Sequence, residues 1–263
     1  MNKLICSILI YSIANLSVLS CGVNEVEIFE SNSQESIGNS VISMNEFFRI
    51  TSIAEELFVE KAKAHQIDLS LDTYWDKPIV NAHTLVLGSS VTISIYGGLV
   101  NLTSLSSRGF AVALCHELGH ALGGAPYFGD FNNTVEGGAD YYSSNDCLKE
   151  LLPALQLPTL QNVSEEVSMI CSQDKDRDTC EGVLTGGLDL MNVLSSLLSN
   201  ESIALSYKTP DLSVSESTLR SYPSYQCRVD TLLRGYFNIS KPACWFNKND
   251  LSNERDNSGV ISI

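Results

Sequence analysis

Two histidines and a glutamate near the middle of the chain form a His-Glu-x-x-His pattern: His116, Glu117 and His120. Residues four apart lie on one face of a helix, so both imidazoles could reach the same metal ion. Zinc held in this way lowers the pKa of a bound water to roughly 7, and the adjacent carboxylate could then take the proton of that water. The alternative is a surface helix that carries these residues by chance. The apolar run 110–115 that precedes them is typical of a buried helix and favours the zinc site.

A catalytic zinc site needs a third protein ligand, with the fourth position left for water. One class of zinc enzyme places a third histidine at the position that Pro126 occupies here, so that class is excluded. The next candidates downstream are Glu136 and Asp140, which are four residues apart and share one face of a following helix. We expect Glu136 to be the third ligand and Asp140 to accept the outer N–H of a ligand histidine. The alternative is a pair of solvated carboxylates at a helix start, where acidic residues are favoured.

The elements that position these residues can be predicted from apolar periodicity and from glycine, proline and capping residues. The helix with the histidines should begin at residues 106–107 and end at residues 123–124. Alternation over residues 91–96 predicts a half-buried strand, which glycines 97–98 would turn. Further helices are expected at residues 44–65, 134–152, 163–171, 179–199 and 225–237. The sequence therefore predicts an α+β fold that is mainly helical.

Six cysteines follow the N-terminal region, at positions 115, 147, 171, 180, 227 and 244. In an exported chain, where disulfides persist, this even number suits up to three bridges. Proximity along the chain favours Cys171 with Cys180 and Cys227 with Cys244, although sequence alone does not select the pairing. Cys115 lies inside the predicted buried helix and could equally be a free core thiol.

The 263-residue chain is acidic, with a net charge of −15. Nucleic-acid binding requires clustered Lys and Arg, which the sequence lacks, so nucleic acid is excluded as a partner. Asp174, Asp176 and Asp178 alternate like the ligands of a calcium loop, but the glycine and closing glutamate of such a loop are missing. We expect a solvated loop there.

The N-terminus has the pattern of a secretory signal, with Lys3, a short apolar run and small residues before Cys21. Cys21 resembles the cysteine of a bacterial lipobox, which is acylated and becomes the first residue of the mature protein. The alternative is an ordinary signal peptide cleaved elsewhere. We expect a lipoprotein signal at residues 1–20 and a flexible polar tether at residues 21–43. The protein would then be exported to the bacterial cell envelope and held in a membrane by acyl chains, and Gly22 favours the outer membrane, facing the periplasm.

The His-Glu-x-x-His pattern with Glu136-Gly-Gly-Ala-Asp140 resembles the gluzincin zinc metallopeptidases, in particular the HtpX-like and CAAX-prenyl-protease-type family. Further similar segments are Asn81–His83, Val91–Tyr96 and Gly98–Val100, which match that family's edge strand and the element after it, and Tyr222–Leu232. The resemblance extends from about residue 45 to 240, and its specific part is the two metal motifs. It implies a compact, minigluzincin-like zinc-protease domain over residues 44–247, with a small antiparallel sheet beside the zinc helix. Residues 248–263 would form a frayed tail.

The resemblance also implies roles for single residues. An edge strand would bind the substrate backbone by strand addition, and His83 could lie at the rim beside it or be an ordinary strand-surface histidine. The family's histidine that steadies the oxyanion is Tyr222 here, and a phenol can also donate to an oxyanion. Arg228 matches the family's arginine and would pair with Asp140 or another buried acid, unless it is a surface charge.

We therefore predict a zinc-dependent endopeptidase of the cell envelope that acts on a peptide or protein substrate. Zinc would be held by His116, His120 and Glu136, with Glu117 as general base. The spacing from His120 to Glu136 is short for the family that the chain resembles, so this would be a trimmed version of it. The substitution of Tyr222 supports a second hypothesis. In that hypothesis the chain is a catalytically weak or inactive zinc-binding lipoprotein that serves as an envelope scaffold or binding module. The intact Glu117 opposes this hypothesis, because zinc retention alone does not require that carboxylate.

Overall fold

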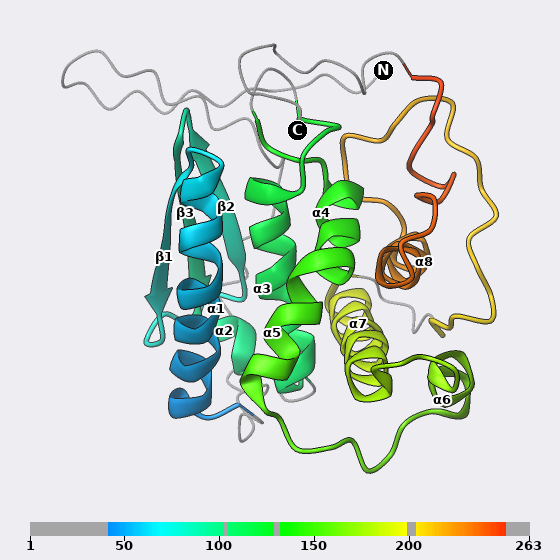
Figure 1. Ribbon diagram of the computed structural model, residues 1–263, viewed down its shortest axis with the longest axis horizontal. Helices are drawn as coiled ribbons and strands as arrows, with labels where there is room; N and C mark the ends of the chain where they lie inside the picture. Colours follow the sequence, from blue (N-terminus) through cyan, green and yellow to red (C-terminus); the bar gives the residue numbers. More distant parts are fainter. Residues whose placement is uncertain (1–41, 103–104, 129–131, 199–203, 251–263) are drawn as a thin grey trace.

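The computed structural model describes residues 42–102, 105–128, 132–198 and 204–250. The expected signal, Cys21, nearly all of the tether and most of the tail lie outside the described residues. A small sheet with one helix in front occupies one side of the molecule, and the remaining helices pack on the other side (Figure 1). In the described part of the chain, no helix is both long enough and apolar enough to cross a bilayer.

Helix α1 (Met44–Ala64) lies against the sheet. It begins where the Ser43 side chain accepts a hydrogen bond from a backbone N–H of the first turn. Its buried side chains recur every three or four residues, at Phe47, Ile50, Ala54 and Phe58. The helix therefore turns one apolar stripe toward the core.

The sheet is mixed and contains three strands, β1 (Asp68–Tyr74), β2 (Ala82–Leu87) and β3 (Ser90–Tyr96), in the order β1-β3-β2. β3 pairs antiparallel with β2 but parallel with β1. The expectation of an antiparallel sheet is thus wrong for the pairing of β1 with β3. No strand was predicted at residues 68–74, so this parallel pairing was not expected.

The predicted strand at residues 91–96 is β3, but it lies at the centre of the sheet and not at its edge. Its apolar side chains Val91, Ile93 and Ile95 are buried, as a strand with neighbours on both sides requires. The edge beside helix α3 (Ser107–Leu122) is formed by β2.

Glycines 97–98 do not form the predicted turn but begin the short helix α2 (Gly97–Val100). Gly97 lies directly on the backbone of Trp75, and Gly98 lies on that of Ile79. A Cβ atom at either position would collide with these backbones, so the two glycines are required by close packing.

Helix α3 occupies the centre of the fold, between the sheet and the other helices (Figure 1). It is followed by a helical run that comprises α4 (Glu136–Tyr142), the π-helical turn η1 (Ser143–Cys147) and α5 (Leu148–Leu155), where one helix at 134–152 was expected. The remaining helices are α6 (Glu165–Cys171), α7 (Arg177–Leu198) and α8 (Tyr225–Tyr236). The fold belongs to the α+β class and is mainly helical, as predicted.

All six cysteines of the described region form disulfides. The two bridges expected from proximity, Cys171–Cys180 and Cys227–Cys244, are confirmed. Cys115 bonds to Cys147, so the free-thiol alternative is wrong. This third bridge links α3 to the turn that follows α4.

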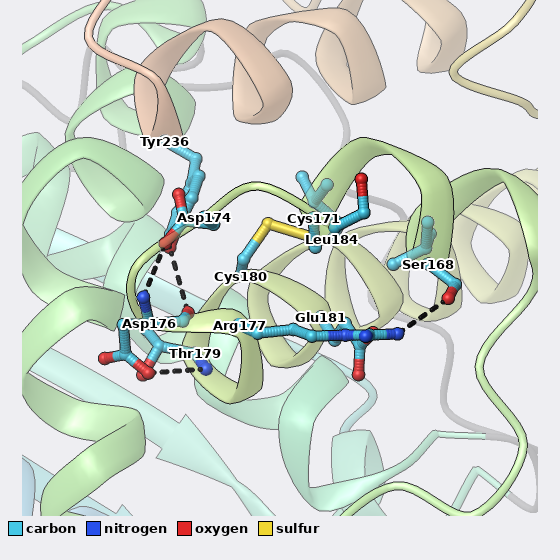
Figure 2. The surroundings of a disulfide bond; sticks show 12 residues. Ser168, Cys171, Asp174, Asp176, Arg177, Thr179, Cys180, Glu181, Leu184 and Tyr236 are labelled. Carbon is cyan, nitrogen blue, oxygen red and sulfur yellow. Dashed lines mark hydrogen bonds and ion pairs between the residues drawn. A yellow bond between two sulfur atoms is a disulfide. The ribbon is translucent and has the colours of Figure 1, made fainter.

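The acidic loop between α6 and α7 is fastened by its own side chains, as Figure 2 shows. Asp176 accepts the backbone N–H of Thr179 at 3.2 Å and caps the start of α7. Asp174 accepts the hydroxyl of Tyr236, from α8, at 3.2 Å and the backbone N–H of Asp176 at 2.8 Å. These two carboxylates therefore tie the loop beside the Cys171–Cys180 bridge to α7 and α8.

Helices α3 and α4 approach closely at Gly119 and Ala139. A Cβ at Gly119 would lie 2.6 Å from the carbonyl oxygen of Ala139 and 2.8 Å from its Cα. Because these are backbone atoms, they can yield only if the two helices move apart. Glycine within the His-Glu-x-x-His segment thus sets the distance between the two helices.

We expect Gly119→Ala to lower the free energy of unfolding by about 1–3 kcal/mol, because overpacking against a backbone outweighs the gain in helix propensity. Gly182→Ala is the matched control, since its added Cβ would meet the flexible end of Leu152 at 3.1 Å. The control should be as stable as the wild type or more stable. Urea denaturation measures both, and equal stability of the two variants would contradict the account.

Candidate metal centre

Helix α3 holds His116, Glu117 and His120 in the interior, where they are 6%, 8% and 8% exposed. Ser106 caps the start of the helix: its side chain accepts a hydrogen bond from a backbone N–H of the first turn, and its own N–H donates to Asp189 of α7 at 2.8 Å. Polar side chains at this depth require partners, and the partners come from other elements.

Helix α4 brings Glu136 to the two histidines. The Nε2 atoms of His116 and His120 lie 3.2 Å and 3.7 Å from Oε2 of Glu136. Ligand atoms from all three residues lie within 4.8 Å of one another, so that the group could hold one metal ion. The structure thus brings together the three residues proposed as ligands, from two helices.

The outer nitrogens of both imidazoles are already engaged. Nδ1 of His120 lies 2.7 Å from the carbonyl oxygen of Thr134, which can only accept a hydrogen bond, so this nitrogen carries the proton. Nδ1 of His116 lies 2.8 Å from Oδ1 of Asp140 and donates to that carboxylate. In the neutral form, each ring therefore turns the lone pair of Nε2 toward Glu136.

This arrangement fits a cation. When both rings are neutral, as in a metal complex, two imidazole lone pairs and the carboxylate oxygen of Glu136 converge, and that oxygen is buried without a hydrogen-bond partner among the described residues. Lone pairs that face one another repel, whereas a metal ion between them would satisfy all three. The residues present therefore suit a metal ion with two nitrogen ligands and one oxygen ligand.

Asp140 forms a buried ion pair with Arg228 of α8. The guanidinium donates to Oδ2 at 2.7 Å and to Oδ1 at 2.9 Å, and Arg228 is 5% exposed. Burial raises the pKa of Asp140, but Arg228 and His116 lower it by more, so the net pKa lies well below its usual range. The structure places Arg228 in the interior, against the alternative of a surface charge.

Glu117 is held from the sheet. The hydroxyl of Thr84, on β2, lies 2.7 Å from Oε2 of Glu117 and 2.9 Å from its backbone carbonyl oxygen. The hydroxyl can donate to either oxygen and so fixes the carboxylate beside its own helix. This contact joins the edge strand to the helix of the metal centre.

Tyr222 lies over Arg228, with the guanidinium 5.5 Å from the centre of its ring. The residue is 49% exposed, and no hydrogen bond fixes its hydroxyl within the described part of the chain. Partial burial and the negative charge of Glu136 raise the pKa of Tyr222, so the phenol stays protonated at neutral pH. It can therefore donate a hydrogen bond beside the centre.

Thr84 and Thr134 are site residues that the sequence did not indicate. Thr134 holds His120 through its carbonyl oxygen, and its N–H donates to the carbonyl oxygen of the same histidine at 3.0 Å. Every residue has a backbone carbonyl, so the identity of Thr134 does not indicate this contact. The sequence predicts extended structure over residues 79–96, which includes β2, but it does not indicate the contact of Thr84 with Glu117.

A second cluster of possible ligands comprises Asp211, Cys227 and Cys244. Its two sulfur atoms are bonded to each other, so neither is available as a thiolate. The histidine-glutamate group is therefore the metal site that this structure supports.

Comparison of the chain with protein-family models, with curated proteins and with solved structures found no match. The fold and this site define its class. It is an α+β protein with a buried group of two histidines and a glutamate that could bind a metal ion.

The Cys115–Cys147 bridge should support the metal centre, because it ties the histidine helix to the end of the Glu136 helix. We expect Cys115→Ala/Cys147→Ala to lose about 2–5 kcal/mol of stability and to bind metal more weakly. The control Cys171→Ala/Cys180→Ala breaks a bridge between α6 and α7 and should keep the affinity of the wild type. Competition with a chelating dye measures affinity, and equal affinity in both double variants would refute the coupling.

Proposed function

We propose that the protein is a zinc-dependent endopeptidase of the gluzincin type, with His116, His120 and Glu136 as the zinc ligands. The observation that carries the proposal is the convergence of their three ligand atoms within 4.8 Å. Two imidazoles and one carboxylate form the ligand set of several catalytic zinc sites, which leave the fourth position to water. Glu117 follows a ligand directly in sequence and is fixed by Thr84.

Each residue of the site then has a chemical role. Bound zinc would polarise the scissile carbonyl and lower the pKa of the attacking water. Glu117 would accept the water proton and pass it to the leaving amine. The protonated phenol of Tyr222 would donate a hydrogen bond to the oxygen that gains negative charge. Asp140 and Arg228 would hold the ring of His116 in its orientation.

Strand β2 would bind the substrate backbone. The N–H of Tyr96 donates to the carbonyl of Asn81, so odd-numbered residues of β2 form the hydrogen-bonded pairs with β3. The even-numbered residues Ala82, Thr84 and Val86 then turn their backbone groups toward the free edge. An extended peptide could pair with these groups next to Glu117.

The same proposal places the protein in the bacterial cell envelope, as a lipoprotein anchored through Cys21. Support comes from the signal-like N-terminus and from the three disulfides, which persist in oxidising compartments outside the cytosol. The envelope would supply peptide or protein substrates.

Glu117→Gln and Glu136→Ala should separate catalysis from metal binding. Glu117→Gln should retain about one zinc per chain and lose peptide cleavage by roughly 10²–10⁴-fold, because it removes the general base. Glu136→Ala should lose the metal together with the activity. Zinc content by elemental analysis and digestion of a quenched peptide library test both. A Glu117→Gln variant as active as the wild type would exclude the mechanism.

A second candidate function is a zinc-binding scaffold or binding module with little or no turnover. It is favoured by Tyr222, which is half exposed and whose hydroxyl no described residue fixes. This arrangement holds an oxyanion donor less firmly than a buried side chain would.

Tyr222→Phe distinguishes the two candidates. If the phenol stabilises the oxyanion, the variant should keep its zinc and its KM while kcat falls by about 10²–10³-fold. Steady-state kinetics on a fluorogenic peptide provide the measurement. If neither the wild type nor the variant cleaves any peptide of a diverse library while both bind zinc, the scaffold function is the correct one.

A further inference from the structure

Strand β2 is an edge strand without the protection that edge strands usually carry. In the described part of the chain no strand pairs with its outer edge, and its sequence contains no Asp, Glu, Lys or Arg. Leu85 and Leu87 are 38% and 52% exposed on it. The opposite edge, β1, exposes Asp68 and Asp72, which discourage pairing with another chain. The sheet thus protects the edge that lies away from the metal centre and leaves open the edge beside it.

A row of stacked rings crosses the outer face of the sheet and ends at this open edge. Tyr74 of β1 stacks on Tyr96 of β3, with ring centres 5.3 Å apart and planes inclined by 17°. His83 of β2 stacks on the other face of Tyr96, at 5.7 Å and 26°. Both faces of Tyr96 are thus covered, and His83 is the last ring of the row. The next place in the row is that of a side chain on a strand added to β2.

The register of β2 favours a close contact at that place. His83 belongs to the residues that hydrogen-bond to β3, so a peptide residue opposite it on the free edge would be in a non-hydrogen-bonded pair. In an antiparallel pair, such residues hold their side chains closest together. In such an antiparallel pair, the residues two and four positions before it in the peptide would lie opposite Leu85 and Leu87, on the same face.

We propose that β2 selects extended peptide segments with an aromatic side chain that stacks on His83. Apolar side chains two and four residues away pack beside Leu85 and Leu87. The occupant is a peptide in extended form, because Thr84, the neighbour of His83, contacts the candidate base Glu117 and so places the added strand at the metal centre. The inference rests on the proposed function only where cleavage of the peptide is concerned. Binding of the peptide can be measured without cleavage.

The test uses zinc-loaded Glu117→Gln protein and fluorescent peptides that differ only in having Trp or Ala at one position. Fluorescence anisotropy should show that the best Trp position binds about three- to tenfold more tightly than Ala, the range expected for one aromatic pair. His83→Ala in the same background should abolish this preference, and His83→Phe should restore it. His65→Ala, which alters an exposed histidine at the end of α1, should leave it unchanged.

The outcomes separate the inference from the function that it extends. Aromatic-dependent binding that disappears in His83→Ala supports the inference even if the wild type cleaves none of the peptides, a result that would overturn only the proposed hydrolysis. Equal binding of Trp and Ala peptides at every position overturns the inference, and so does a preference that survives His83→Ala. A dimer formed through β2, detected by light scattering and lost in Leu87→Ser, would show that a second copy of the chain occupies the edge and would also overturn it.

Discussion

The carboxylate of Asp140 holds three helices together, and the metal centre depends on it. It lies on α4 and accepts hydrogen bonds from Arg228 of α8 and from His116 of α3. A buried charge is stable only when its partners are in place, and removing one of them leaves the others unpaired. The position of α4, and with it that of Glu136, therefore depends on Arg228 of α8 as well as on α3. The centre is a product of the whole domain and not of the histidine helix alone.

The sequence reveals those parts of the site that obey local rules. His116 and His120, like Glu136 and Asp140, are four residues apart, and helical geometry alone places each pair on one face. The remaining contacts are distant in sequence. The pairing of Arg228 with Asp140, 88 residues away, was expected only from the family resemblance, and the contact of Thr84 with Glu117, 33 residues away, was not expected. Nothing in the periodicity of a helix or strand indicates which distant element it will meet.

The sheet illustrates the same limit. The alternation of β3 predicts a strand, and the burial of Ile93 and Ile95 agrees with it. Strand order, however, depends on which strands pair. β3 lies between β1 and β2, although it follows both in the sequence, so β2 is an edge strand. Residues 91–96 therefore fill the centre of the sheet, and the edge beside the metal centre passes to β2, whose Thr84 then reaches Glu117. Residues 91–96 are correctly predicted as a strand, but their place in the sheet is not, so they do not form the edge that could bind a peptide.

The π-helical turn η1 determines the angle between α4 and α5 through the number of residues that it contains. A π turn holds one residue more than an α turn, so it offsets α5 from the continuation of α4 by about 100°, the rotation of one helical residue. Glu136 and Asp140 can thus face α3 while Leu148 and Leu151 face the core. Asp146 of η1 is exposed, so its side chain is not what this turn depends on. The loss or gain of a single residue here would instead change the angle between the face of Glu136 and that of Leu148 by about 100°.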